Sequence, residues 1–326
     1  MSGGAEGGPG RPAYLVTGGA GFIGSHLVEA LVKRGERVRV LDDFSAGRRE
    51  NLAGAAGRVE VLEGDIKDVE ACRRACEGVG YVLHHAARVS VEESLADPVG
   101  CHEVNALGTL KMLCAAREAG CKRFVYAGSA SVYGDTATIP HREDMAERPL
   151  SPYAVAKHVG ELYCRAFFDL YELDTVVLRY FNVFGPRQDA SSPYSGVIAK
   201  FVGDLLQGKG ITVYGDGEQS RDFVAVENVV NANLLACTAA EAPGKVMNIG
   251  CGERMSVNRL GEELRELTGV SCEVGHGAAR SGEVRHSQAD IRRAREVLGY
   301  EVAVPVMEGL RRTVGWYRKV GAGGGR

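Results

Sequence analysis

Short apolar runs alternate with segments of helical spacing along the first 179 residues of the chain. The first apolar run is followed by a glycine-rich turn and then by a segment with hydrophobic positions at helical spacing. We expect strands at 13–17, 38–41, 59–62, 81–87, 122–127 and 174–179, and further helices at about 67–77, 99–119 and 152–171. Repeated strand–helix units predict a parallel, doubly wound α/β sheet, whose ligands bind beyond the carboxyl ends of its strands.

The pattern changes after residue 179. A loop punctuated by glycine and proline covers 180–187, and a polar stretch covers 188–196. Helices are then expected at 197–207, 227–240, 256–268, 290–297 and 306–319, with short strands at 211–214 and 246–249. These more interrupted pieces predict a second, smaller lobe of mixed α/β structure.

The turn after the first apolar run has the spacing of a dinucleotide-binding loop. Its glycines fit Gly19-x-Gly21-x-x-Gly24, and also the variant Gly18-x-x-Gly21-x-x-Gly24. One glycine makes the tight turn, one lets a pyrophosphate approach the N–H groups of the helix N-terminus, and one lets helix and strand pack closely. Asp42, which ends the second strand, should accept ribose hydroxyls and repel a 2′-phosphate, which favours NAD over NADP.

This loop makes the sheet a dinucleotide-binding Rossmann domain. We expect that domain to comprise residues 11–180 and about 222–250. Residues 181–221 and about 251–320 should then form the smaller lobe, which binds the substrate. Residues 1–10 and 321–326 are rich in glycine and are expected to be disordered tails.

Composition and charge exclude several other classes of protein. Hydrophobic residues make up 45% and charged residues 25% of the chain, and the formal net charge is -3, which gives no basic footprint for nucleic acid. No apolar run approaches the length of a membrane span, and the first residues contain no apolar signal core. The cysteines form no Cys-x-x-Cys pair, and the adjacent His84 and His85 would point to opposite faces of a strand. We therefore expect a cytoplasmic protein with reduced thiols and no metal site.

Tyr153 and Lys157 are the strongest candidates for chemistry. They are four residues apart on a predicted helix, so they lie on one face, and Ser151-Pro152 before them reads as a helix start. An ammonium close to a phenol stabilises the phenolate and lowers the phenol pKa, which makes a base usable near neutral pH. The pair alone is weak evidence, but it follows a dinucleotide loop and a strand that delivers Ser129 at its carboxyl end.

Arginines recur in the loops of the second half of the chain. Arg187, Arg221, Arg280 and Arg285 each lie in a loop rather than on a predicted helix. Any one of them could be a surface residue, but two or three converging would suit bidentate binding of a diphosphate. Arg48 and Arg49 are a mild signal for NADP, with a solvent-facing role as the simpler interpretation.

The assembled motifs closely resemble the extended short-chain dehydrogenase/reductases, and within them the nucleotide-sugar 4-epimerases. The resemblance runs from about residue 13 to 318. It is carried by TGGAGFIGSH, LDDFSAG, HHAARVSVEES, GSASVYGD, SPYAVAK, RYFNVFGPRQ, YGDGEQSRDFV, MNIGCGE and RSGEVRHSQADI. So many motifs in order are specific for the family.

The resemblance implies a catalytic triad of Ser129, Tyr153 and Lys157. Ser129 stands four residues before Tyr133, as the family's catalytic Ser or Thr does, and Ser131 is the less favoured candidate. Tyr153 would take the proton from the sugar 4-hydroxyl while NAD takes the C4 hydride, Lys157 would bond the nicotinamide ribose, and Ser129 would bond the same sugar oxygen. NAD is regenerated in each turnover and stays tightly bound. The implied NAD contacts are Gly18, Gly21, Phe22, Ile23, Gly24, Asp42, Asp43, Asp65, Ile66, Ala86, Ala87, Asn105, Tyr153, Lys157 and Tyr180.

Two positions narrow the implied reaction. Related 4,6-dehydratases place an Asp-Glu pair directly after the catalytic Ser or Thr, where this chain has Ala130 and Ser131. Related UDP-glucuronate decarboxylases carry Glu where Ser131 stands. Elimination is hard to drive without an acid there, so epimerisation is favoured. Gly128, Ala190 and Ala199 depart from the family pattern without removing a catalytic group.

The resemblance also implies UDP-sugar contacts and a gate residue. Substrate binding would involve Ser129, Tyr153, Asn182, Gly196, Val197, Ile198, Tyr214, Arg221, Arg280, Glu283 and Ser287. Ser287 stands where a bulky Tyr would exclude a 2-acetamido group, so a small residue predicts activity on UDP-N-acetylglucosamine and UDP-N-acetylgalactosamine, with or without UDP-glucose and UDP-galactose. The alternative is that Ser287 merely caps the helix expected at 290–297.

Other functions remain open at this point. A UDP-glucose 4-epimerase restricted to plain hexoses is the second candidate, and a UDP-glucuronate 4-epimerase, which needs a cation for the C6 carboxylate, is the third. A non-catalytic NAD sensor would be expected to lack Tyr153 or Lys157. The family usually forms homodimers through a four-helix bundle, here built from residues 99–119 and 152–171 of each subunit.

Overall fold

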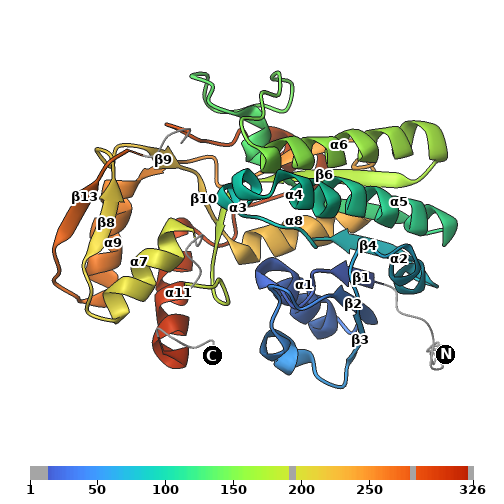
Figure 1. Ribbon diagram of the computed structural model, residues 1–326, viewed down its shortest axis with the longest axis horizontal. Helices are drawn as coiled ribbons and strands as arrows, with labels where there is room; N and C mark the ends of the chain where they lie inside the picture. The colour runs from blue at the N-terminus through green and yellow to red at the C-terminus, as the bar shows by residue number, and fades with distance from the viewer. Residues whose placement is uncertain (1–13, 191–195, 280–283, 322–326) are drawn as a thin grey trace, which may run out of the picture.

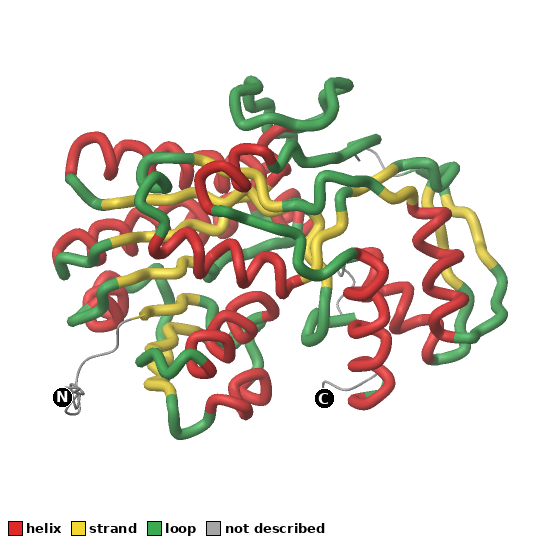
Figure 2. The backbone as a smooth tube through the Cα atoms, turned by 180° about the vertical axis from the view of Figure 1, so that it is seen from behind, coloured by secondary structure: helices red, strands yellow, loops and turns green. Residues whose placement is uncertain are grey.

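The computed structural model describes residues 14–190, 196–279 and 284–321. The expected N-terminal tail, residues 322–326, Arg280 and Glu283 lie outside the described residues. A large sheet flanked by helices occupies one side of the molecule, and a smaller group of helices and short strands occupies the other (Figures 1 and 2). None of the helices in the described part is long and apolar enough to cross a membrane.

Seven parallel strands form the large sheet in the order β11-β6-β5-β4-β1-β2-β3 (Figure 1). They are β1 (Tyr14–Thr17), β2 (Val38–Asp42), β3 (Val59–Glu63), β4 (Tyr81–His84), β5 (Arg123–Ser129), β6 (Asp174–Tyr180) and β11 (Val246–Ile249). The strand order reverses direction between β1 and β4, so the doubly wound sheet predicted from the sequence is confirmed. Most residues of β1, β2, β5 and β6 are buried, as a parallel sheet covered on both faces requires.

Each face of the sheet has its own hydrophobic cluster. One cluster joins the sheet to α1 (Phe22–Lys33) and α8 (Val226–Thr238), with Val16 and Val40 among its strand residues. The other joins the sheet to α2 (Val69–Cys76), α5 (Thr109–Glu118) and α6 (Pro152–Tyr171), with the neighbouring positions Leu15 and Leu41. Alternate strand residues thus point to opposite clusters. Short helical segments at η1 (Arg49–Ala55), α3 (Val91–Ala96) and η3 (Ala130–Tyr133) connect these elements.

The helix predicted at 99–119 is interrupted by a wider turn. It consists of α4 (Pro98–His102), the π-helical segment η2 (Glu103–Gly108) and α5. The Thr109 hydroxyl donates to the Asn105 carbonyl oxygen at 2.7 Å and provides a partner for that group inside the π segment. The hydrophobic pattern of the sequence predicts the helix but does not reveal the change of register.

The strand predicted at 81–87 ends early, at His84. The His85 N–H donates to the Thr17 carbonyl oxygen at 3.2 Å and to the Thr17 hydroxyl at 3.1 Å, and the Ala86 N–H donates only to that hydroxyl, at 3.1 Å. The chain therefore leaves the sheet where the cofactor site begins.

The elements around α7 (Val197–Leu206), α9 (Val257–Thr268) and α11 (Val306–Val320) form what we call the second lobe. Its short strands pair as β8 (Ile211–Tyr214) with β13 (Val274–Gly277), and as β9 (Ser220–Arg221) with β12 (Met255–Ser256). Its core includes Phe201, Leu260 and Leu310. The boundaries of the two predicted domains remain a prediction.

One predicted loop contains a strand. Residues 182–184, expected to be irregular, form β7 (Asn182–Phe184), which pairs in parallel with β10 (Phe223–Ala225). Its partner β10 is distant in sequence, and the glycine and proline that follow β7 are typical of a loop. Local sequence patterns therefore do not predict this strand.

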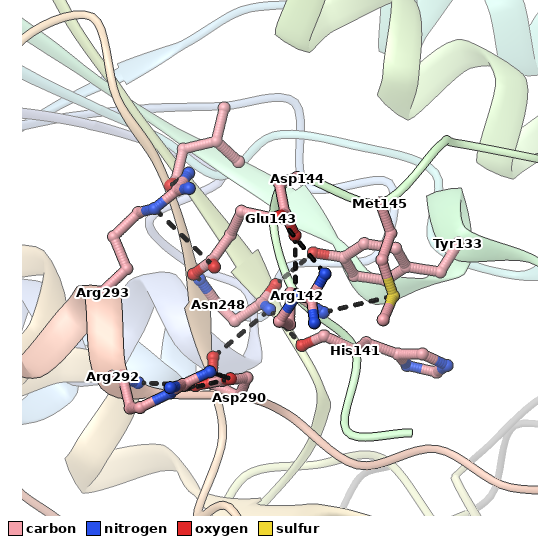
Figure 3. Close-up of polar contacts among 11 residues, drawn as sticks. Tyr133, His141, Arg142, Glu143, Asp144, Met145, Asn248, Asp290, Arg292 and Arg293 are labelled. Atoms are coloured by element: carbon pink, nitrogen blue, oxygen red, sulfur yellow. Dashed lines mark hydrogen bonds and ion pairs between the residues drawn. The ribbon is translucent and has the colours of Figure 1, made fainter. Parts of the chain in front are cut away.

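The free edge of β11 is covered by two segments, one with Tyr133, His141 and Glu143 and the other with Arg293 (Figure 3). The Asn248 backbone N–H donates to Glu143 Oε1 at 2.8 Å, and the Asn248 side-chain amide donates to the His141 carbonyl oxygen at 2.9 Å. The Tyr133 hydroxyl donates to Asn248 Oδ1 at 2.7 Å. The segment that includes α10 (Arg292–Leu298) lies beside them, with Arg293 Nε 3.8 Å from Glu143 Oε2. This cover protects an edge that could otherwise pair with another chain, and it anchors the residues after Ser129.

Candidate active site

The loop between β1 and α1 leaves no room for side chains. Gly18 has a φ of +65°, and a Cβ added there would lie 2.8 Å from the Ala86 backbone nitrogen. A Cβ on Gly24 would lie 2.1 Å from the Gly18 carbonyl oxygen. Gly21 caps α1, and the first turn of α1 has no acidic side chain. Close backbone and an open helix N-terminus form a cradle that fits the pyrophosphate of NAD.

Asp42 lies at the end of β2, beside this cradle. Its carboxylate accepts the Ala20 N–H at 2.8 Å and the Phe44 N–H at 2.8 Å, and burial raises its pKa while these two bonds lower it. A Cβ on Gly47 would lie 2.6 Å from Asp42 Oδ1, so the following loop closes tightly over the carboxylate. The position is the one expected for a ribose acceptor.

The two arginines that follow Asp42 both have carboxylate partners. Arg48 Nη2 lies 2.8 Å from Asp189 Oδ2, and Arg49 pairs with Glu63 and stacks on Phe44 with its guanidinium carbon 3.9 Å from the ring centroid. Each positive charge is already balanced by an acid. This arrangement favours the interpretation that neither arginine receives a 2′-phosphate.

The paired histidines belong to a hydrogen-bond network. His84 Nε2 lies 3.1 Å from the Thr109 hydroxyl, which itself donates to Asn105, so the histidine nitrogen must be the donor. His84 Nδ1 is then an acceptor, and Thr17 Oγ1 donates to it at 2.8 Å. Burial holds the pKa of His84 well below its ordinary value. His84 is therefore a neutral link between β1 and the π segment.

His85 lies outside the strand and faces another element. Its Nε2 is 2.9 Å from the Tyr180 hydroxyl, and burial lowers the pKa of His85 to about 3. The Tyr180 hydroxyl also accepts from Asn233 Nδ2 at 2.7 Å. The Tyr180 hydroxyl is therefore engaged by two side chains of the protein.

Ser129 and Tyr153 meet at the carboxyl end of β5. Ser129 is the last residue of β5 and lies opposite Tyr180 of β6. Burial raises the pKa of Tyr153, and a hydrogen bond from the Ser129 hydroxyl acts in the opposite direction. The structure thus brings together the serine and the tyrosine that the sequence singled out.

Lys157 lies one turn along α6 and is almost completely buried. Its Nζ donates to the Ala127 carbonyl oxygen at 2.9 Å and lies 5.1 Å from the centroid of the Tyr126 ring. Burial lowers the pKa of Lys157 to about 8, so the ammonium form still dominates at neutral pH. The effects on the Tyr153 phenol, however, are burial, Ser129 and Cys101, and the lowering by Lys157 expected from the spacing is not among them. The ammonium is directed at a strand carbonyl, which accounts for the difference.

The other expected cofactor residues surround this centre. Asn105 holds the backbone of Arg88, accepting its N–H and donating to its carbonyl oxygen, both at 2.8 Å, so it shapes the loop after β4. Asp65 accepts the Lys67 N–H at 2.8 Å in the turn before α2. Phe22 and Ile23 are the first residues of α1, and the remaining residues lie in loops that follow strands of the sheet: Asp43, Ile66, Ala86 and Ala87.

The expected substrate residues extend from the catalytic end of β6 into the second lobe. The Asn182 backbone N–H donates to the Asp222 carbonyl oxygen at 3.0 Å, and the Asn182 side chain is exposed. Gly196 begins α7, whereas the Ile198 side chain is buried in the lobe's core, so only its backbone could face a ligand. Tyr214 ends β8 and is partly buried, as is Val197.

Three of the arginines expected in loops make polar contacts in the structure, and Arg221 lies in the short strand β9 rather than in a loop. Arg221 Nη1 donates to the carbonyl oxygens of Ser220 and Arg285, at 3.0 and 3.3 Å. Arg285 makes two bonds of 2.7 Å to the Asp216 carboxylate, and Arg187 Nη2 lies 2.7 Å from Glu29 Oε2. The role of Arg221 in binding a diphosphate stays a prediction.

Ser287 lies against the strand that carries Arg221. Its backbone N–H donates to the Ser220 carbonyl oxygen at 3.0 Å, and the residue is 8% exposed. Helix α10 begins only at Arg292 and is capped by Ile291, so Ser287 does not cap it. The helix-capping alternative considered for Ser287 is therefore wrong.

A largely buried charge cluster joins α6 to β6. The Arg179 guanidinium Nη2 is 2.8 Å from Glu161 Oε2 and 2.6 Å from Glu147 Oε1. Potential metal ligands of Glu147, His158 and Glu161 converge here, but the guanidinium occupies their centre. A Cβ on Gly128 would lie 3.0 Å from Glu161 Oε1, which gives a physical reason for the glycine before Ser129.

A model of the NAD dependent epimerase/dehydratase family matches residues 14–250. The chain belongs to this family. As a family member it uses NAD, and the glycine cradle and Asp42 are the features of this chain that fit the cofactor. The roles of individual residues in binding and catalysis remain predictions.

Similar proteins support this membership over nearly the whole chain. UDP-glucose 4-epimerase of Mycolicibacterium smegmatis is 40% identical over 308 residues, which are 93% of this chain and 98% of that protein. The structure of UDP-glucose 4-epimerase with UDP-glucose from Thermotoga maritima has a TM-score of 0.90 at 40% identity, covering 94% and 99% of the two chains. UDP-N-acetylglucosamine 4-epimerase from Methanobrevibacter ruminantium, in complex with UDP-N-acetylmuramic acid, has a TM-score of 0.90 at 36% identity, covering 95% and 99%.

Some residues at the site were not found from the sequence. Thr17 holds the turn after β4, and its only signal is a hydroxyl at a strand end directly before the glycine loop. The Arg179–Glu161 pair has no local signal, because its members are 18 residues apart on different elements. Ser131 was set aside as a weaker catalytic candidate, yet it contacts Ser129 directly.

Proposed function

We propose that this family member is a UDP-sugar 4-epimerase that interconverts UDP-N-acetylglucosamine and UDP-N-acetylgalactosamine, and also UDP-glucose and UDP-galactose. The observation that carries the proposal is the meeting of Ser129 and Tyr153 above buried Lys157, at the strand end next to the dinucleotide cradle. An alcohol bound there would have its proton within reach of a base and its carbon next to the cofactor.

Tyr153 is the base in this proposal. It takes the proton from the sugar 4-hydroxyl and returns a proton to the same oxygen after the sugar has turned over in the pocket. NAD, when bound, accepts the C4 hydride and gives it back on the other face. Burial raises the pKa of Tyr153, so the phenolate depends on the hydrogen bond from Ser129, which lowers it.

Lys157 supports the site in two ways. Its ammonium is buried without a carboxylate bonded to it, so its charge acts over a short range in a medium of low dielectric. Its Nζ is held by the Ala127 carbonyl oxygen of β5, and in this proposal the ammonium also bonds the nicotinamide ribose.

The choice of N-acetylated sugars depends on Ser287. A serine has little volume, and its segment is fixed against Ser220. In this proposal Ser287 is part of the pocket wall, where its small side chain would leave room for a 2-acetamido group. The Methanobrevibacter relative named for UDP-N-acetylglucosamine supports this reading. The two relatives named as UDP-glucose 4-epimerases favour the second candidate, an enzyme of plain hexoses.

The proposal is tested by incubating purified protein with UDP-N-acetylglucosamine, and separately with UDP-galactose, without added NAD. Epimers separated by chromatography from both substrates would support the whole proposal, including a retained cofactor. Turnover of UDP-galactose alone would leave the second candidate. No product from either, even with added NAD, would refute 4-epimerisation of these sugars and direct the assay to UDP-glucuronate. Tyr153→Phe is the control and should keep NAD while losing about a thousandfold in rate.

Ser287→Tyr tests the gate separately. Because a bulky ring would fill the space of the acetamido group, we expect the variant to lose turnover of the acetylated pair and to keep that of UDP-galactose. The comparison of kcat/KM for the two substrates is the measurement. An equal loss on both would show that Ser287 does not select the substrate.

A further inference from the structure

Ser131 makes two contacts with the same atom of Ser129. In the short helical turn η3, the Ser131 backbone N–H donates to Ser129 Oγ at 3.2 Å, and the Ser131 hydroxyl oxygen lies 2.9 Å from Ser129 Oγ. Nothing in the assigned chemistry uses Ser131. The two contacts together determine what the Ser129 hydroxyl is able to do.

The hydroxyl protons can be assigned by counting. A serine hydroxyl has one proton to donate and two lone pairs to accept with. Ser129 donates its proton to Tyr153 when the tyrosine is a phenolate, since a phenolate can only accept. The Ser131 hydroxyl must then be the donor to Ser129, and its N–H fills the second lone pair. In this state Ser129 cannot accept from any other group.

We propose that Ser131 is a positioning residue that holds Ser129 as the hydrogen-bond donor to Tyr153. This inference rests on the proposed epimerase function. No proton leaves Ser129 or Ser131 in this arrangement, because the proton of the sugar hydroxyl passes to Tyr153 alone. Without the Ser131 hydroxyl, a lone pair of Ser129 becomes free. Ser129 can then rotate and accept from the neutral phenol, which stabilises the wrong form of the base.

The turn that carries Ser131 is fixed at its other end. Val132 is fully buried, its carbonyl oxygen accepts the Arg148 N–H at 2.8 Å, and Tyr133 is bonded to Asn248 of β11 (Figure 3). Gly134 follows with a φ of +65°, and a Cβ there would lie 2.1 Å from the Arg148 carbonyl oxygen. Ser131 is therefore held in place from both sides, as a positioning role requires.

A double-mutant cycle tests the proposal. Ser131→Ala should lower kcat about tenfold, the value of one hydrogen bond, while KM stays within about twofold. Ser129→Ala should lower kcat about a hundredfold. If Ser131 acts only through Ser129, the double variant should match Ser129→Ala within about twofold. Losses that multiply in the double variant would overturn the proposal.

The pH profile gives a second, independent reading. The titratable groups around the phenol are Lys157 on α6, Cys101 on α4 and Tyr126 on β5. His84 at the end of β4 and His85 directly after it act on Lys157. Ser131→Ala leaves all of them in place. In this variant the acidic limb of the kcat–pH profile should move to higher pH by up to about one unit, because Ser129 is no longer held as a hydrogen-bond donor to the phenolate. An unmoved limb would contradict the donor role.

Conservative variants separate positioning from folding. Ser131→Thr keeps the hydroxyl and should restore most of the rate lost in Ser131→Ala. If Ser131→Ala melts early or loses NAD, Ser131→Cys, which has a similar shape and a weaker donor, takes its place in the cycle. Wild-type protein that forms no epimer would refute the proposed function itself. Wild-type turnover with a multiplicative cycle would refute only the role of Ser131.

Discussion

Gly24 shows how little space one position in the cofactor loop leaves. A Cβ there would come within 2.1 Å of the Gly18 carbonyl oxygen and 2.9 Å of Gly19 Cα, both of them backbone atoms that cannot turn away. The third glycine of the fingerprint is therefore required by the packing of the loop on itself. The spacing of the motif predicts a cofactor, but the distances explain why glycine is needed.

Gly24→Ala tests whether the packing of the glycine loop requires glycine at this position. We expect a loss of about 2 kcal/mol or more in the free energy of unfolding, because backbone must move, together with the loss of bound NAD. Gly54→Ala is the matched control, since a Cβ there meets nothing within 4 Å, and it should change stability by less than about 0.5 kcal/mol. Chemical denaturation and the ratio of NAD to protein are the measurements. Retained NAD in Gly24→Ala would contradict the packing argument.

The neutral histidines at the end of β4 make stability depend on pH. Burial lowers the pKa of His84 well below 6.5 and that of His85 to about 3, whereas both would take up a proton in the unfolded chain below about pH 6.5. The unfolded state then binds more protons, so stability falls as the pH falls. Each histidine contributes about 1.4 kcal/mol per pH unit between about pH 6 and 4.

His84→Gln isolates one of these two contributions. We expect the pH dependence of the unfolding free energy between pH 6 and 4 to become shallower by about 1.4 kcal/mol per pH unit, since one proton fewer is taken up. Denaturant titrations at several pH values measure the slope. Near pH 8, where the imidazole is neutral in both states, the two slopes should agree. An unchanged slope at low pH would mean that His84 is protonated in the folded protein.

At the scale of elements, helix α6 connects the proposed catalytic residues to the sheet. Ser151 caps it, with its hydroxyl accepting the Ala154 N–H at 3.2 Å, and its first two turns present Tyr153 and Lys157. One turn later Glu161 bonds Arg179 of β6, and both side chains are almost fully buried at 4% and 2% exposure. The helix is therefore held to the sheet directly below its catalytic residues.

Glu161→Ala should be much more harmful than the loss of an exposed pair on the same helix. It leaves a buried guanidinium with less compensation and should cost about 3–5 kcal/mol in the free energy of unfolding. Asp169→Ala, which breaks the exposed Arg165–Asp169 pair, should cost less than about 0.5 kcal/mol. Replacing both Glu161 and Arg179 with apolar residues of similar volume should recover much of the loss. Equal effects of the two single variants would show that burial does not set the value of this pair.

The sequence predicted those elements whose signal is local. The glycine loop, the strands of the sheet and the cap and face of α6 each depend on neighbouring residues, and the structure contains them. The strand β7 was missed because its partner β10 lies some 40 residues away, where no local pattern can show the pairing. The π segment was missed because its register depends on Thr109 and Asn105 rather than on hydrophobic spacing.

The same limit applies to the site. Serine, tyrosine and lysine were recognised by their types and places at strand and helix ends. That the Lys157 ammonium binds the Ala127 carbonyl, and that the Tyr180 hydroxyl is engaged by Asn233, are facts of packing. Side-chain directions of this kind depend on neighbours from other elements, so no spacing rule contains them.

At the scale of the whole molecule, one short segment connects the sheet helices with the second lobe. The Pro186 carbonyl oxygen lies 2.9 Å from His26 Nε2, and the Arg187 guanidinium pairs with Glu29, both on α1. Asp189 pairs with Arg48 beyond β2, while the Gln188 carbonyl oxygen accepts from Tyr317 of α11. This segment therefore joins α1, the helix beside the pyrophosphate cradle, to α11 of the second lobe, where the substrate is proposed to bind.

An exposed apolar surface lies on the helices expected to pair in a homodimer. Leu162 and Leu170 of α6 are 56% and 71% exposed, and Val99 of α4 is 68% exposed. We expect the protein to be a dimer in solution and Leu162→Arg to make it monomeric, because a charge would be buried in the bundle. Light scattering after size exclusion measures the mass. A monomeric wild type, or a dimeric Leu162→Arg variant, would contradict the predicted interface.

The order in which the chain visits the sheet has a consequence for its synthesis. After β6 the chain leaves for β7, α7 and β8, and only later adds β11 beside β6. On the ribosome, the growing polypeptide therefore carries a hydrophobic sheet with one side of β6 unpaired until residue 249 has emerged. Nascent chains stalled before that point should be the intermediates most prone to aggregation and most dependent on chaperones.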